Sequence, residues 1–295
     1  MYIDAKHCCI ALAILFSAIL VPIEGSLPKL SEEKFLDRLD HTDSLVLNMD
    51  VSYTIDEVFS PRIRRHPMLM IGSERHLDVI WLKEGDKYFY DIRTNNPVAP
   101  VPVSRSIDAY NGEWRFQWYP RQNTGDIFAD RVRFAWPIPL DFGLVGGNRD
   151  KSLAQELREA EIVEFHQDRW SQHECYFVDA NKSNGGRIQA WIDPNIGYRP
   201  RYLKVYNRSG NISSECSAVF EEISEGIWFP MSGVYKLYGI DKETGERIVS
   251  NERKMKVRKA KLNTNLTLQD FTIEFPLGTR VYDHMRRRPY VVGAP

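Results

Sequence analysis

The chain has 295 residues, of which 43% are hydrophobic, 12% aromatic and 27% charged. This is the composition of a folded globular protein and not of a disordered one. Lys and Arg (39) nearly balance Asp and Glu (40), which argues against a nucleic-acid-binding protein, since such proteins usually carry a basic excess. Two local basic runs, at 254–261 and 286–288, are interpreted as solvated strand faces and a charged tail.

The first 25 residues differ from the rest. Lys6 and His7 precede a continuous apolar run, Cys8–Ile23, and a Glu-Gly-Ser sequence follows it. This order predicts a secretory signal peptide, because the run is short for a membrane span, which needs ~20 residues. An uncleaved membrane anchor is the alternative. We expect residues 26–295 to form a single exported domain in the periplasm or cell envelope, attached to the inner membrane if the signal is not cleaved.

The exported part keeps two cysteines, Cys175 and Cys216. In an oxidising compartment such a pair often forms a disulfide. A bond requires the two Cα atoms to lie close together, which the sequence does not reveal. Two buried thiols therefore remain the alternative.

The first elements of the domain are a helix and several strands. Residues 30–39 predict a short amphipathic helix, with Ser31 as its N-cap and apolar residues at helical spacing. From residue 45 to 55 apolar and polar residues alternate, which predicts a long strand with one buried face. Further strands are expected up to a hairpin at 110–118, whose Asn-Gly pair is a strong turn signal.

A loop rich in Pro and Gly, at 120–147, and a helix at 150–160 are expected to interrupt the strands. After them a meander is predicted, with strands near 161–167, 173–180, 187–193, 199–207, 214–223, 227–238, 246–262, 271–275 and 289–293. Strands joined by short turns are antiparallel neighbours. We therefore predict an α+β, mostly β fold. It is a large curled antiparallel sheet, or unclosed β-barrel, covered by the N-terminal helix and the central helical insertion.

The sequence carries no sign of catalysis. The motifs G-x-S-x-G, H-E-x-x-H and G-x-G-x-x-G are all absent. The segment 165–175 is rich in polar residues, but the spacing of His166, His173 and Cys175 matches no usual zinc pattern. We predict a protein that is not an enzyme and has neither metal nor cofactor. A metal-dependent enzyme built around His166 and His173 is the least favoured reading.

Aromatic residues provide the candidate binding site. Trp114, Phe116 and Trp118 project from one face of a predicted strand, and Phe134 and Trp136 lie in the insertion. Aromatic residues favour strands, so these side chains could simply fill a core. The alternative is that they line an apolar cavity between sheet and helices, as in sites for greasy ligands.

Three stretches carry a family resemblance. They are Trp191-Ile-Asp-Pro-Asn-Ile-Gly-Tyr-Arg-Pro200, Gly226-Ile-Trp-Phe-Pro230, and a closing segment from Phe271 to Asp283. With the export signal, the helix and the interrupted meander, they resemble the LolA/LolB/RseB superfamily, in particular its larger uncharacterised members of the kind found in planctomycetes. In the closing segment we expect Phe271, Ile273 and Phe275 to pack against the sheet.

The resemblance implies an unclosed barrel that binds a lipid or a lipoprotein acyl chain without catalysis. The alternative that it leaves open is a regulatory or scaffold protein that contacts an envelope membrane protein. Carriers of this superfamily hold their cover with buried polar residues, for which Arg75 and Arg115 are candidates here. The motifs themselves mark turns and strand starts, and none is a catalytic signature.

Overall fold

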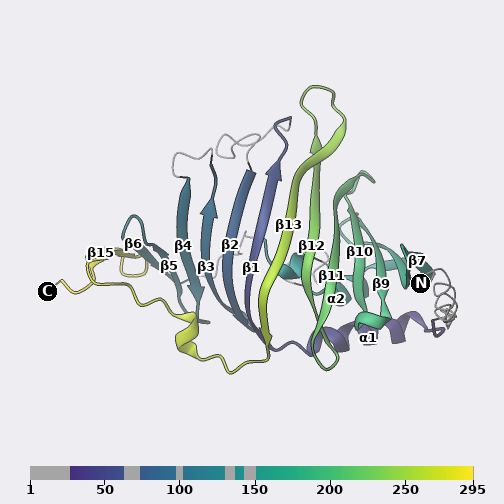
Figure 1. Cartoon of the computed structure of the whole chain (residues 1–295), viewed down its shortest axis with the longest axis horizontal. Coiled ribbons are helices and arrows are strands. Elements are labelled where there is room, and N and C mark those ends of the chain that lie inside the picture. Colours follow the sequence, from purple (N-terminus) through teal and green to yellow (C-terminus); the bar gives the residue numbers. More distant parts are fainter. Residues whose placement is uncertain (1–26, 63–73, 98–101, 130–136, 143–150, 295) are drawn as a thin grey trace, which may run out of the picture.

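The computed structural model describes residues 27–62, 74–97, 102–129, 137–142 and 151–294. The predicted signal peptide and the candidate residues Phe134 and Trp136 lie outside these ranges. Figure 1 shows one broad curled sheet, with the two helices α1 and α2 at the half formed by the later strands. The fold class predicted from the sequence is confirmed.

The strands of the described residues form a single sheet in the order β15-β14-β6-β5-β4-β3-β2-β1-β13-β12-β11-β10-β9-β8-β7. Neighbours are antiparallel, except for β14 and β6, which are parallel. The elements are α1 (Glu32–Ser44), β1 (Asn48–Phe59), β2 (Glu74–Glu84), β3 (Lys87–Asn95), β4 (Val103–Tyr110), β5 (Arg115–Tyr119), β6 (Thr124–Phe128), η1 (Pro139–Asp141), α2 (Leu153–Arg158), β7 (Glu161–Trp170), β8 (His173–Asn181), β9 (Arg187–Asp193), η2 (Pro194–Ile196), β10 (Arg199–Tyr206), β11 (Ile212–Ser224), β12 (Ile227–Ile240), β13 (Arg247–Leu262), η3 (Leu268–Phe271), β14 (Arg280–Asp283) and β15 (Arg288–Val291).

This strand order consists of two meanders that meet at the centre of the sheet. The first runs outward from β1 to β6, and the second begins at the far edge with β7 and returns to β13. Strand β13 then pairs with β1 along most of its length. The connection from β6 to β7 therefore joins opposite sides of the sheet, and it contains η1 and α2.

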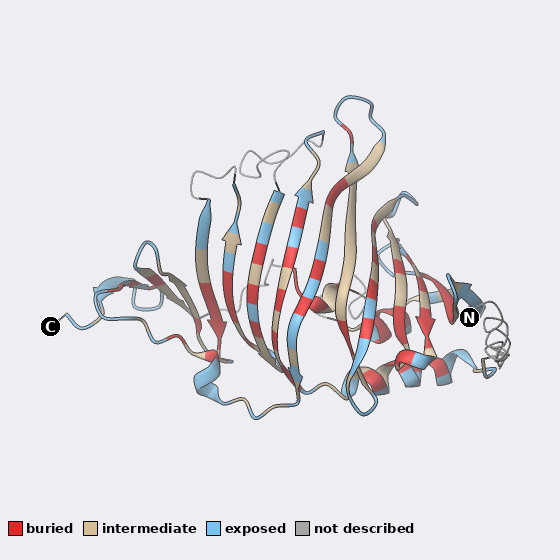
Figure 2. Cartoon of the chain, viewed as in Figure 1, coloured by how far each residue is buried: buried red, intermediate tan, exposed pale blue. Residues whose placement is uncertain are grey.

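One face of the sheet is buried and is called the inner face here. In β1 its members are Val51, Tyr53 and Ile55, which are fully buried, while Ser52 and Thr54 point to the opposite, outer face. Figure 2 shows this alternation as buried bands along the central strands. The regular spacing of apolar residues thus fixes which side of each strand is covered.

Two apolar clusters lie on the inner face. One joins β8–β11 to Phe35, Leu36 and Leu39 of α1 and to Leu153 and Leu157 of α2. The other joins β1–β3 and β11–β13 to Ile138 and Phe142. Tyr235 packs against both clusters and so connects them.

The C-terminal segment covers part of the outer face. Phe271 and Ile273 are buried, and Ile273 and Phe275 contact a third cluster that includes Ile107 and Ala109 of β4. The prediction that these residues pack against the sheet is confirmed. The predicted strand at 271–275 is wrong, because the chain leaves η3 in an extended form that is not part of the sheet.

Candidate functional site

The inner face and the elements that cover it form the candidate site. Helix α1 is attached to the sheet by Arg199, the first residue of β10. Its buried guanidinium pairs with the carboxylate of Asp43 and donates through Nη2 to the carbonyl oxygen of Thr42, at 3.1 Å. These partners lie in the last turn of α1, where unpaired carbonyl groups favour a cation.

The pair between Arg199 and Asp43 is incompletely satisfied. Burial raises the pKa of Asp43, and Arg199 opposes that rise. Burial also lowers the pKa of Arg199, against the pull of Asp43. Within the described residues, Arg199 Nε and one oxygen of Asp43 have no hydrogen-bond partner. Such a pair contributes little net stability, because the loss of water around Arg199 and, in part, around Asp43 offsets the attraction between the two charges.

Two of the three motifs that carry the family resemblance meet at this attachment. Gly197, in the turn before Arg199, has a φ of 69°, which suits glycine. A Cβ atom there would lie 2.8 Å from Cδ1 of Trp228 and 3.4 Å from Cγ2 of Thr42. The motif around Asp193 and Gly197, the motif around Trp228 and the end of α1 are therefore packed against one another. Their role is to position the helix.

The central cluster is covered by the short segment 137–142. Phe142 is fully buried, and its ring lies where a side chain at Gly233 would collide with it, at 2.7 Å. The same ring meets Tyr235 edge-on, with 6.1 Å between centroids. Tyr53 donates a hydrogen bond from its hydroxyl to the carbonyl oxygen of Pro137, at 3.0 Å. The regular secondary structure of this segment is a single 3-10 turn, η1.

A charged group lies on the inner face beside Tyr235. The buried carboxylate of Glu57 accepts hydrogen bonds from Nε of Arg75 at 2.8 Å and from Nε of Arg253 at 2.6 Å. The three residues are register partners on adjacent strands. Arg253 also lies over the ring of Tyr235, 5.9 Å from its centroid. The carboxylate of Asp141, in the cover, also acts on Tyr235, so the charged groups at this place are of both signs.

The arginine that holds α1 was missed by sequence reasoning. The candidates Arg75 and Arg115 pair with Glu57 and Asp108, both of which are in the sheet. The available signal for Arg199 was its position, directly after the glycine turn of a recognised motif. Sequence spacing alone could not connect it with Asp43, because the partners are far apart along the chain.

The aromatic residues predicted to line a cavity do not all lie together in the structure. Phe116 and Trp118 are register partners of Ala109 and Ile107 and pack in the outer cluster with Ile273 and Phe275. Trp114 is half-buried in the turn before β5. The structure therefore places Phe116 and Trp118 away from the inner clusters. Contact of the whole set with a ligand stays a prediction.

The cysteines and histidines do not come together. Cys175 and Cys216 are free, buried thiols. Cys216 belongs to an inner cluster, whereas Cys175 alternates with the inner residue Tyr176 and so faces outward. The possible disulfide is therefore not formed, because the strands direct the two thiols to opposite faces. Burial raises the pKa of Cys175 to about 11 and of Cys216 to about 12. Among the described residues no group of three or more His, Cys, Asp or Glu side chains could hold a metal ion.

The described helices include none with the length and apolar character that a membrane crossing requires.

Comparison with known proteins gives a likeness of fold. No family model matches the chain, and no curated protein matches it. Among solved structures it is similar to a DUF1329 family protein from Desulfovibrio piger, with 11% identity, a TM-score of 0.48, and coverage of 87% of this chain and 98% of that one. It is also similar to a LolA superfamily protein from Nitrosomonas europaea, with 13% identity, a TM-score of 0.45, and coverage of 83% and 99%.

A third similar structure is an outer membrane lipoprotein-sorting type of domain from Vibrio parahaemolyticus, with 11% identity, a TM-score of 0.46, and coverage of 81% and 96%. At these identities and with TM-scores below 0.5, the likeness concerns the fold alone and says nothing about ligand or partner.

Proposed function

We propose that the chain is a non-catalytic binding protein of the cell envelope that takes an apolar ligand, such as a lipid or a lipoprotein acyl chain, on its inner face. The observation that carries the proposal is the cover of the central cluster. In the described residues it consists of segment 137–142, which contributes Ile138 and Phe142. A ligand chain can replace these side chains on the sheet without any strand being broken.

The magnitudes favour such a replacement. Full burial of a side chain such as Ile138 or Phe142 contributes about 1.5–3 kcal/mol. An acyl chain gains about 0.8 kcal/mol for each buried methylene, so ten of them supply about 8 kcal/mol. The burial of a ten-methylene chain is thus larger than that of the two side chains, and the difference has to offset the cost of association.

The charged group beside Tyr235 supports a particular kind of apolar ligand. Arg253, which pairs with Glu57, lies over the ring of Tyr235, and Tyr235 meets Phe142 of the cover. An amphiphile with an anionic head would place its tail on the inner face and its head near Arg253. A fatty acid or an anionic phospholipid has this chemistry.

The proposal is tested by the uptake of a fluorescent fatty acid and by native mass spectrometry of the exported protein. Phe142→Ala removes the competing ring, so we expect it to bind the probe at least about tenfold more tightly, given the ~1.5–3 kcal/mol that burial of such a side chain contributes. Phe89→Ala, in the outer cluster, is the matched control and should leave uptake unchanged. Absence of bound lipid together with no uptake by either variant would contradict the proposal.

A second candidate is regulation through a protein partner. Strand β15 is exposed along its whole length, and the basic run Arg286–Arg288 leads into it. If this surface binds the protein partner, deletion of residues 286–295 should abolish capture of an envelope partner and leave fatty acid uptake intact. The reverse result would leave the lipid proposal as the better one.

A further inference from the structure

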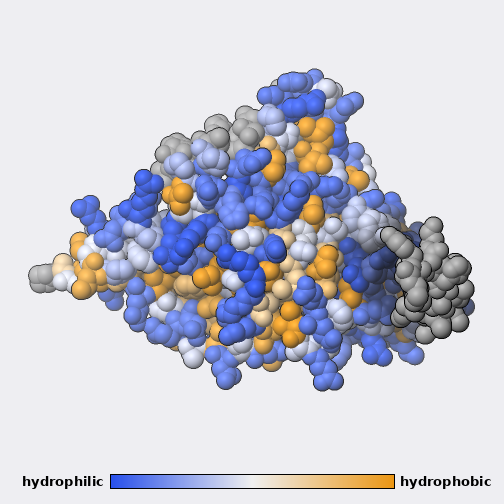
Figure 3. All heavy atoms as spheres, viewed as in Figure 1, coloured by the Kyte–Doolittle hydropathy of each residue, from blue (hydrophilic) through white to orange (hydrophobic). Residues whose placement is uncertain are grey.

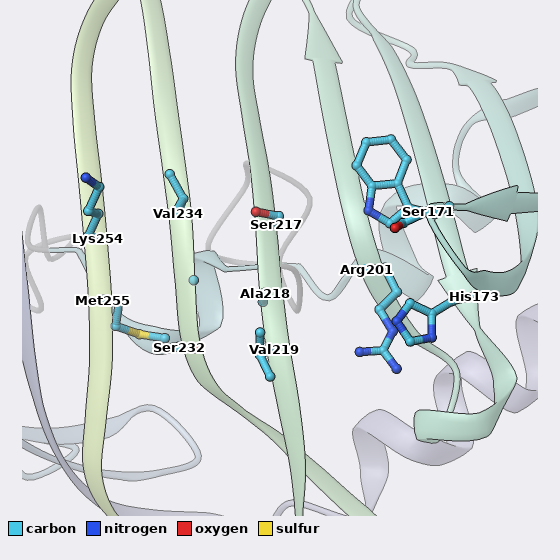
Figure 4. A pocket seen from close by; sticks show the side chains of 12 residues that line it. Ser171, His173, Arg201, Ser217, Ala218, Val219, Ser232, Val234, Lys254 and Met255 are labelled. Carbon is cyan, nitrogen blue, oxygen red and sulfur yellow. The ribbon is translucent and has the colours of Figure 1, made fainter.

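A hollow of about 460 Å³ lies on the outer face, opposite the surface just discussed (Figure 4). Ser217, Val234 and Lys254 are register partners on β11, β12 and β13 and form one part of its lining. Their neighbours Ala218, Gly233 and Met255 are register partners too, and Ala218 and Met255 belong to the inner cluster. The hollow is therefore a separate feature on the far side of the sheet.

The wall of the hollow is the turn between β7 and β8, which is fixed by aromatic contacts. Trp170 stacks on Tyr202, with centroids 4.0 Å apart and planes 8° from parallel. Trp191 lies beside both rings and donates from Nε1 to Asp168 Oδ2 at 2.8 Å. This hydrogen bond lowers the pKa of Asp168 and keeps it charged. The wall is thus held in place before any ligand arrives.

The floor near this wall carries an oriented arginine. Arg201 contacts a single oxygen of Asp193, from Nε at 3.0 Å and from Nη2 at 2.9 Å. Asp193 is 2% exposed in its side chain, and His173 Nδ1 lies 3.9 Å from the same oxygen. Figure 4 shows Arg201 and His173 next to each other at one end of the hollow. Asp193 therefore fixes the orientation of the Arg201 guanidinium group.

The opposite side of the hollow is formed by β13. Lys254 is exposed and lies 3.3 Å from Glu252. Figure 3 shows that hydrophilic residues dominate the surface of the molecule in this view. Asp193 and Glu252 are not among the lining residues, although each directly contacts a cation that lines the hollow.

The lining is rich in hydrogen-bond donors. It offers the N–H groups of Trp170, His173, Arg201 and Lys254 and the hydroxyls of serine side chains, and its described residues include no Asp or Glu. A ligand that suits this set presents acceptor oxygens, and charged ones give the strongest hydrogen bonds. The volume is that of a site for a small molecule, which ranges over ~300–1,000 Å³.

We propose that this outer hollow binds a small ligand that carries a carboxylate or phosphate group, of the size of an acidic or phosphorylated sugar. The oxyanion is received by Arg201 and His173, with Lys254 across the hollow, and the remainder of the ligand lies against Trp170. The site is independent of the apolar inner face. The same oxyanion could belong to a free metabolite or to the head group of a lipid in a membrane.

The test uses the whole exported protein and three probes: inorganic phosphate, glucose 6-phosphate with glucose as its uncharged control, and vesicles of phosphatidylglycerol with vesicles of phosphatidylcholine as theirs. Calorimetry and tryptophan fluorescence measure binding, the latter because Trp170 lines the hollow. We expect glucose 6-phosphate to bind and glucose not to bind. Binding of phosphatidylglycerol vesicles with no binding of the free anions would assign the oxyanion to a lipid head group.

Two variants locate the binding. Ser217→Phe fills the hollow and Lys254→Gln removes a cation, and each should weaken binding at least about tenfold, since the first excludes the ligand and the second removes a charge-assisted contact. The controls, Ser52→Phe in β1 and Lys261→Gln in β13, make the same changes on the outer face away from the hollow. They should bind like the unmodified protein. All four must show the same far-ultraviolet circular dichroism. No binding of any probe at millimolar concentration, or unchanged binding by Ser217→Phe and Lys254→Gln, overturns the proposal.

Discussion

The attachment of α1 depends on Gly197. It has a left-handed φ of 69° and lies against Trp228 and Thr42. A side chain at this position must both adopt an unfavourable backbone conformation and displace the indole ring. A single glycine therefore connects a turn motif, a strand motif and a helix.

Replacement of this glycine separates the two effects. We expect Gly197→Ala to lower the free energy of unfolding by about 2–4 kcal/mol, of which ~1–2 kcal/mol comes from the left-handed conformation and the rest from the forced contact. Gly210→Ala is the control, because Gly210 has a φ of 75° but nothing within 4 Å of a Cβ atom. Guanidinium unfolding of both variants measures the difference. Equal losses would show that the contact with Trp228 is unimportant.

Helix α1 as an element depends on the buried pair of Arg199 and Asp43. Its amphipathic face packs Phe35, Leu36 and Leu39 on the sheet, and the pair fixes its C-terminal end. The apolar contacts supply most of the stabilisation, while the ion pair sets the position of the end.

We expect Arg199→Met to destabilise the protein by about 3 kcal/mol at pH 7, because it leaves Asp43 buried without its partner. The double variant with Asp43→Leu should recover most of that loss. A double variant no more stable than Arg199→Met would contradict this account of the pair. Chemical unfolding of the four proteins of this cycle provides the measurement.

The same variant should show a pH dependence with a definite sign. Burial already raises the pKa of Asp43, and loss of Arg199 raises it further. A carboxyl group whose pKa is higher in the folded state than in the unfolded state adds stability at low pH, and this is lost as the pH rises through the folded value. The deficit of Arg199→Met should therefore be smaller at pH 4 than at pH 7. A deficit that grows on acidification would rule this out.

At the scale of the whole molecule, the C-terminal segment holds the first meander. It runs over the outer face, buries Ile273 on β4 and ends in β14, which pairs with β6. We expect Ile273→Asp to lower the melting temperature by several degrees, because it places a charge in an apolar cluster. Leu277→Asp makes the same chemical change at a side chain that is 82% exposed, and it should have little effect. Calorimetry distinguishes the two outcomes.

The sequence predicted the kind of sheet but not the assignment of its faces. The alternation along β1 and the turn signals between later strands were sufficient for an interrupted antiparallel meander. Alternation shows that Phe116 and Trp118 share a face, but it does not say which one. That is decided by their register with β4 and by Ile273 and Phe275, which come from the far end of the chain.

The contacts of the candidate site could not be predicted from local sequence patterns either. Arg199 meets Asp43, and Arg253 meets Glu57, across distances along the chain that no spacing rule covers. The outer hollow likewise brings the turn between β7 and β8 against β11–β13. Each of these contacts depends on the curl of the sheet, in which the spatial order of the strands differs from their order along the chain.

The meeting of β1 with β13 has a consequence for how the chain is made. When the ribosome has delivered β1–β6, strand β1 is still an open edge, and it stays open until β13 is finished. Until β13 pairs with it, β1 presents an unpaired edge, and such edges promote aggregation of partly folded chains.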